Sequence, residues 1–147
     1  MSVYDILSIV ISMVALVISG IALYWGNRFS KATVLQQIKQ SIDNAKTHVE
    51  AVSLAISPII SKEQPTNDEK RQKEDLQRIY DSAFEKVLNA YEDGCQKYYA
   101  HLVLKQEFRR SYFSDLRDYV EEFPDKFSEP ITRYTYILKL YKEWHKP

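Results

Sequence analysis

The sequence lacks most of what extracellular and nucleic-acid-binding proteins depend on. Cys95 is the only cysteine among 147 residues, so no disulfide can form within the chain, which suits a reducing compartment. Lys and Arg together number 20, and so do Asp and Glu. No basic excess is therefore available to neutralise the phosphates of a nucleic acid. We expect neither an internal disulfide nor a nucleic-acid partner.

The residue patterns of enzymes and metal sites are missing as well. His48, His101 and His145 lack the spacing of metal ligands, and the sequence has no His-Glu-Xaa-Xaa-His motif, paired cysteines, glycine-rich phosphate loop or Gly-Xaa-Ser-Xaa-Gly motif. On a helix, His101 would point away from the face of Cys95, so no local thiol–imidazole pair is expected. We predict a protein that is not an enzyme and has no cofactor and no metal.

Glycine is scarce, with three residues, and no segment alternates polar and apolar side chains as a half-buried strand does. Apolar residues instead recur at steps of three and four, which is the period of helices. The predicted fold class is all-α. We expect a transmembrane anchor over residues 1–26, a juxtamembrane stalk helix over 27–60, a loop over 61–67 and a helical cytoplasmic domain over 68–147.

The anchor is predicted from Ile6 to Trp25, which is twenty residues without a charged side chain. As a helix this segment is about 30 Å long, the thickness of the hydrocarbon core of a bilayer. The rest of the chain is too small to surround it as a core helix. A cleaved signal peptide would need a basic start and a shorter apolar region. We therefore predict an uncleaved span in contact with membrane lipid.

The flanking cations predict the orientation of the span. Only Asp5 carries a charge before the span, whereas Arg28, Lys31 and Lys39 follow it closely. Positively charged flanks stay on the cytoplasmic side. We expect a single-pass protein of the inner (cytoplasmic) membrane, with its N-terminus outside and its C-terminal body in the cytoplasm.

Small residues form one stripe along the span. They are Ser8, Ser12, Ala15, Ser19 and Ala22. Close approach at small residues is how helices associate in lipid, so the small-residue stripe predicts self-association of spans. In the alternative interpretation, these hydroxyls bond back to their own helix.

The stalk carries a second apolar stripe, the stalk seam, with steps of three and four. Its residues are Leu35, Ile38, Ile42, Ala45, Val49 and Val52, continued by Ile56 and Ile59. A narrow seam of this kind is typical of coiled coils. It either pairs with a second copy or packs on later helices of its own chain, and we favour a parallel homo-oligomer. The two stripes are out of phase, which predicts a stutter or a break between Arg28 and Thr33. Pro58 predicts that the stalk helix ends or kinks near Ile56 to Ile60.

Three helices are expected after the loop. Thr66 and Glu69 form a capping box for the first, in which Gly94 marks a bend or a close packing site. A turn is expected near Leu102 to Gln106, the second helix stops at Pro124, and the last begins just after Pro130. The apolar faces contain Leu76, Tyr80, Ala83, Phe84, Val87, Tyr91, Cys95, Tyr98 and Leu102 in the first helix, Phe108, Phe113, Leu116, Tyr119, Val120 and Phe123 in the second, and Ile131, Tyr134, Ile137, Leu138, Tyr141 and Trp144 in the third.

Three segments of this body, Leu88 to Cys95, Phe108 to Tyr112 and Tyr136 to Trp144, contain recognisable positions at Tyr91, Glu92, Cys95, Tyr141 and Trp144. In these segments the chain resembles a bacterial family of short proteins with one N-terminal span and a helical cytoplasmic portion. The resemblance implies the same architecture and no catalytic residue.

Two functions fit these features. The favoured one is a membrane-anchored, oligomeric scaffold whose cytoplasmic helices dock a protein partner. The alternative is an effector in which several single-span copies disturb the membrane, for instance in defence against phage, with Ser8, Ser12 and Ser19 lining a path for ions.

Overall fold

The computed structural model describes residues 3–60, 67–129 and 132–145, and these residues form helices and short connections without a β-strand. The helices are α1 (Val3–Ile60), α2 (Asn67–Tyr99), α3 (Lys105–Glu122) and α4 (Thr135–Trp144), and a single 3₁₀ turn, η1 (Pro124–Lys126), follows α3. The all-α prediction is confirmed. The predicted loop and the Thr66 cap lie largely outside the described residues, and Asn67 is already the first residue of α2.

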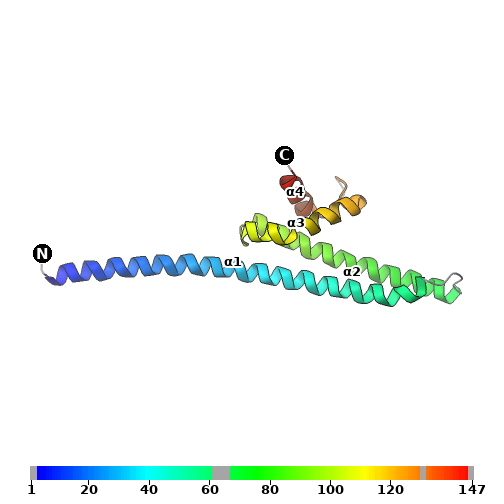
Figure 1. The fold of residues 1–147 in the computed structure, drawn as a ribbon, viewed down its shortest axis with the longest axis horizontal. Coiled ribbons are helices and arrows are strands. Elements are labelled where there is room, and N and C mark those ends of the chain that lie inside the picture. Colours follow the sequence, from blue (N-terminus) through cyan, green and yellow to red (C-terminus); the bar gives the residue numbers. More distant parts are fainter. Residues whose placement is uncertain (1–2, 61–66, 130–131, 146–147) are drawn as a thin grey trace.

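Helix α1 runs for 58 residues without interruption, which corresponds to about 87 Å. Its first half projects alone, and its second half lies beside the other helices (Figure 1). Of the stutter or break predicted between Arg28 and Thr33, the break is ruled out, because every residue there is helical. The two apolar stripes lie on different sides of one helix and face different surroundings, so their change of phase needs no break. Pro58 lies inside the last turn of α1.

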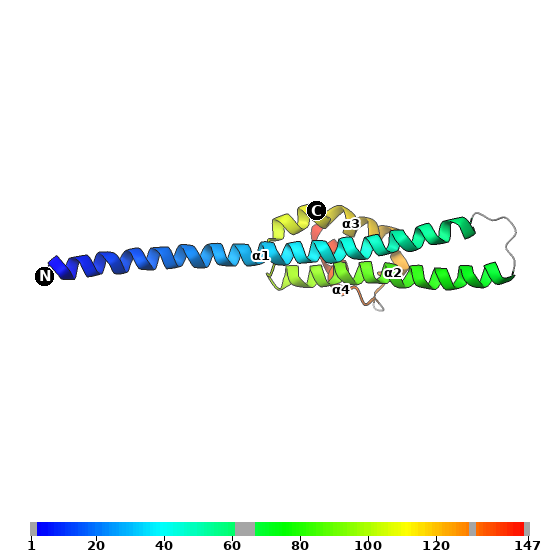
Figure 2. The ribbon, with the colours of Figure 1, turned by 90° about the horizontal axis from the view of Figure 1, so that it is seen from below.

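Helix α2 returns antiparallel to the second half of α1, and the two lie side by side in both views (Figures 1 and 2). The stalk seam packs against this helix and its neighbours. Ile38 and Ile42 are each 1% exposed, Val52 and Ile56 are buried, and Leu35, Ala45 and Val49 pack at the edge of the core. The seam is thus filled within the chain. The structure therefore corrects the favoured interpretation that these residues face a second copy.

Gly94 is a close packing site and not a bend, because α2 continues through it. A Cβ atom at this position would lie 3.1 Å from Cγ2 of Ile38 and 3.2 Å from Cε2 of Phe108. Both neighbours are buried. The absence of a side chain at Gly94 lets α1 and the start of α3 approach α2 closely.

Helices α3 and α4 pack on one side of the α1–α2 pair (Figure 1) and complete an aromatic core. Phe108 contacts the rings of Tyr98, Tyr112 and Trp144 at centroid distances of 5.5, 4.9 and 6.4 Å. The largest fully buried side chains are Tyr91, Phe108, Ile38, Ile42, Leu88, Leu116, Ile137, Leu140, Val87 and Cys95. Because these residues come from all four helices, the core joins them into one body.

The last helix begins at Thr135, later than predicted from Pro130, and its start is fixed by a residue of α2. The carboxylate of Glu92 accepts hydrogen bonds from the backbone N–H groups of Tyr136 (2.8 Å) and Ile137 (2.9 Å). The first N–H groups of a helix have no partner within it, and a negative charge there favours the helix dipole. Glu92 of α2 thus caps α4 from another helix, and no residue near the start of α4 in the sequence predicts this cap.

Candidate functional site

The first half of α1 is an apolar rod that the rest of the protein does not cover. Every described residue from Val3 to Ser30 is exposed, including Leu16 at 74% and Leu23 at 77%. The most apolar stretch of this helix is not buried at all, and the helix is long and apolar enough to cross a membrane. The alternative of a buried core helix is therefore excluded. A contiguous apolar surface of this size is unusual on a soluble monomer.

The apolar rod ends in a pair of aromatic residues. The rings of Tyr24 and Trp25 meet edge to face at a centroid distance of 6.3 Å, and both side chains are more than 60% exposed. Amphipathic rings are favoured at the level of lipid headgroups. The cation Arg28 follows one turn later. The composition of the helix thus changes from apolar to basic within one turn.

The small-residue stripe lies on the exposed surface of the apolar rod. The hydroxyl of Ser12 donates to the carbonyl oxygen of Ser8, and that of Ser19 to the carbonyl oxygen of Ala15, each at 2.8 Å. These bonds match the alternative in which the hydroxyls serve their own helix, and they leave the stripe free for close contact. On a straight helix it lies roughly 130° around the axis from the stalk seam. The span of a second copy packed on the small-residue stripe would therefore not contact the helical body of this chain.

A partly buried polar cluster joins α1, α2 and α3. Lys46 of α1 lies 2.8 Å from Oδ2 of Asp115 on α3, and the hydroxyl of Tyr91 on α2 donates to the same oxygen at 2.5 Å. Lys46 also lies over the ring of Tyr91, 5.6 Å from its centroid. The sequence did not predict this cluster, because Lys46 and Asp115 are 69 positions apart and each looks like an ordinary surface charge.

The pKa shifts in this cluster favour a contact that holds the helices together rather than proton transfer. Burial disfavours the charges, but the contact between Lys46 and Asp115 outweighs burial, so the pKa of Lys46 is raised and the pKa of Asp115 is lowered. Burial, together with the neighbouring carboxylate, raises the pKa of Tyr91. A general acid or base works best with a pKa near neutrality. All three shifts point away from it.

Substitution of Asp115 by Asn is expected to remove a pH-dependent part of the stability. The lowered pKa means that this part is present above about pH 3.9, the pKa of an unfolded aspartate, and is lost as pH falls through the lower folded value. We expect a loss of about 1 kcal/mol at pH 7, because both partners are more than a third exposed and solvent screens the pair.

Thermal unfolding of the full chain in uncharged micelles, followed by circular dichroism from pH 7 to pH 2.5, measures this effect. The melting temperatures of the wild type and Asp115→Asn should converge at the acidic end. Asp93→Asn is the control, because Asp93 pairs with Lys97 on the surface of α2. A difference between Asp115→Asn and wild type that stays constant with pH would contradict the assignment.

The lone cysteine is not arranged for nucleophilic chemistry. Cys95 is fully buried, and burial, followed by the charge of Glu92, raises the pKa of its thiol. A reactive thiol needs the opposite shift and access to solvent. Within the described residues, no group of three or more His, Cys, Asp or Glu side chains is placed to hold a metal ion.

Comparisons of the chain with protein-family models, with curated proteins and with solved structures return no match. Membership of the bacterial single-span family suggested by the three segments in the body stays a prediction. The functional argument therefore depends on the geometry of the chain itself.

Proposed function

We propose that this chain is a single-pass protein of the inner membrane that holds a helical docking body at the cytoplasmic surface. One observation carries the proposal. A single unbroken helix is wholly exposed and apolar in its first half, and is built into the core of the body in its second half. Such a helix needs lipid around one half and protein around the other.

The flanking charges and the continuity of α1 support the orientation and an uncleaved anchor. Arg28, Lys31 and Lys39 follow the apolar rod, which favours a cytoplasmic body. Removal of the apolar rod as a signal peptide would require cleavage inside a continuous helix. The body is proposed to act by binding another protein, because its polar groups hold helices together and are not poised for catalysis.

Self-association is part of the proposal in a revised form. The stalk seam is filled within the chain, so a parallel coiled coil of stalks would require the body to open. The small-residue stripe is exposed and faces away from the body, which allows spans to pack without disturbing it. Copies of the chain are therefore proposed to meet through their spans.

Membrane insertion is tested by placing two charges in the apolar rod. We expect the wild type to float with membranes and to resist extraction at alkaline pH, whereas Val14→Arg/Val17→Arg is released, because each arginine near the centre of a span costs about 3 kcal/mol. The matched control is Leu54→Arg/Ile79→Arg, which changes two exposed apolar residues outside the rod. Wild-type protein that stays in the soluble fraction would refute the proposal.

The same membranes report the orientation through introduced cysteines. Cys95 is buried and serves as an unlabelled background. Val3→Cys should react with a membrane-impermeant maleimide in intact cells, and Leu54→Cys only after permeabilisation, since both positions are at least 75% exposed. The reverse pattern would place the body outside.

A further inference from the structure

A small cleft lies where the apolar rod meets the helical body. It has a volume of about 220 Å³ and is lined by Tyr24, Asn27, Arg28 and Lys31 of α1 and by Leu104, the residue before α3. We call it the junction cleft. It contains two cations, one amide and two side chains with apolar surface.

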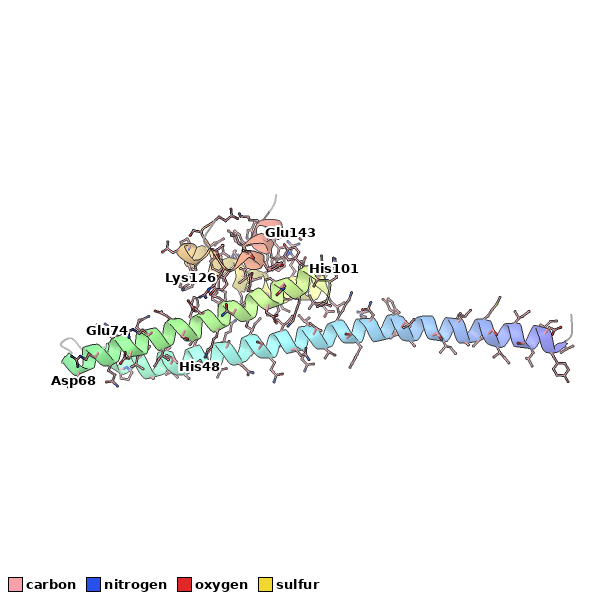
Figure 3. The ribbon with its side chains drawn as sticks, turned by 180° about the vertical axis from the view of Figure 1, so that it is seen from behind. His48, Asp68, Glu74, His101, Lys126 and Glu143 are labelled. Carbon is pink, nitrogen blue, oxygen red and sulfur yellow. The ribbon has the colours of Figure 1, made fainter. Side chains whose placement is uncertain are left out.

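The junction cleft faces the same side of α1 as the body. Tyr24, Arg28 and Lys31 precede Leu35 at steps of four, three and four, so they continue the line of the stalk seam toward the N-terminus. His101, in the turn after α2, lies at the end of that helix directed toward the apolar half of α1, whereas Asp68 and Glu74 lie at the far end (Figure 3). The turn after α2 therefore closes the cleft from the body side.

The turn itself exposes an apolar side chain at this end of the body. His101 adopts a left-handed backbone conformation, with φ of 59°, and the N–H of Leu102 donates to the carbonyl oxygen of Lys97 at 3.0 Å. This is a Schellman-type helix end with histidine in the position that glycine usually takes. It reverses the chain tightly, buries Val103 and leaves Leu102 49% exposed.

Charge is segregated toward this end, although the whole chain is neutral. No acidic residue occurs from Ile6 to Ile42 or from Gly94 to Gln106. Lys97 is neutralised by Asp93 at 2.6 Å, and Lys105 lies over the ring of Tyr98. Among the described residues, Arg28 and Lys31 have no ion-pair partner. The two cations of the junction cleft are thus available to an anion.

The two cations of the cleft lie within the headgroup layer of a bilayer and just beyond it. If hydrocarbon ends near Trp25, Arg28 lies about 4–5 Å and Lys31 about 9 Å beyond it, and the headgroup layer is on the order of 5–8 Å thick on each side. A guanidinium binds two phosphate oxygens at once, and an ammonium adds a point charge. The ring of Tyr24 and the side chain of Leu104 suit the apolar start of the acyl chains.

We propose that the junction cleft binds the phosphate headgroup of an anionic phospholipid. The bound lipid would bridge Arg28 and Lys31 of α1 to the turn that carries Leu102 and Leu104, and so hold the body against the membrane surface. This inference rests on the proposed membrane attachment, and it adds a specific lipid class and site to it.

The test is the lipid dependence of thermal unfolding for the full chain in uncharged micelles. A ligand that binds the folded state raises the melting temperature by mass action. We expect phosphatidylglycerol to raise it, and phosphatidylcholine and inorganic phosphate to leave it unchanged. In Arg28→Gln/Lys31→Gln the concentration of phosphatidylglycerol needed for half the rise should increase about twenty-five-fold, since each cation near the surface contributes about a factor of five.

A second double variant and two other ligands serve as controls. Arg71→Gln/Lys86→Gln removes two exposed cations of α2 outside the cleft and should respond as the wild type does. The proposal would be overturned if phosphatidylglycerol raised the melting temperatures of both double variants equally, or if phosphatidylcholine raised that of the wild type as much as phosphatidylglycerol does. If inorganic phosphate raised it as much, the assignment to a lipid would be overturned. Wild-type protein that floats with membranes but ignores phosphatidylglycerol refutes this site alone. Failure to float refutes the anchor.

Discussion

Replacement of Ile42 by Asp is expected to unfold the helical body. Ile42 is 1% exposed in the core between α1 and α2, so the substitution removes a buried apolar side chain and introduces a carboxylate without a partner. The combined cost is about 4 kcal/mol or more, close to the whole stability of a small domain. Circular dichroism melts and limited proteolysis in micelles measure the loss.

The control for Ile42→Asp is Gln40→Asp, which adds the same charge at an exposed position two residues away and should melt within about 2 °C of the wild type. This pair also distinguishes the two destinations of the stalk seam. If Ile42→Asp left the melting temperature unchanged and instead dissociated an oligomer, the seam would face another copy and the packing within the chain would be wrong.

Substitution of Phe108 by Ala is expected to have the second largest effect. Its ring is fully buried, contacts three other aromatic rings and lies against the gap left by Gly94. Truncation of a buried phenylalanine costs about 3–5 kcal/mol. For a body of roughly 100 residues this lowers the melting temperature by at least about 12 °C.

Glu107→Ala is the control for Phe108→Ala, because Glu107 is the exposed neighbour in the same first turn of α3. We expect a change within about 0.5 kcal/mol for this variant. Equal melting temperatures for Phe108→Ala and the wild type would show that α3 does not pack as described.

The helices could be predicted from the sequence where the signals are local. The period of apolar residues, the uncharged stretch before Trp25 and the stop at Pro124 are each contained in a few neighbouring residues, and the structure has helices in the predicted order. These features need no knowledge of the rest of the fold. The position of Gly94 in a helical pattern predicted either a bend or a close packing site, and its neighbours from α1 and α3 show that it is a close packing site.

Features that depend on distant residues could not be predicted. The start of α4 is fixed by Glu92 from another helix, and the contact between Lys46 and Asp115 joins residues far apart in the chain. The stalk seam could pack either on a second copy or on later helices of its own chain, and only the fold distinguishes these two alternatives. Among the residues of the proposed lipid site, Arg28 and Lys31 were identified as charges that set orientation, but their pairing with Leu104 required the turn after α2.

The unbroken course of α1 has a mechanical consequence. A helix without a hinge acts as a stiff lever, so the tilt of its membrane-embedded half is passed directly to the far end of the body. From Trp25 to Ile60 the lever arm is about 52 Å, and a change of tilt of about 10°, within the range by which spans adjust to bilayer thickness, swings its tip by about 9 Å. Local thinning or thickening of the lipid would thus be converted into lateral displacement of a partner bound there.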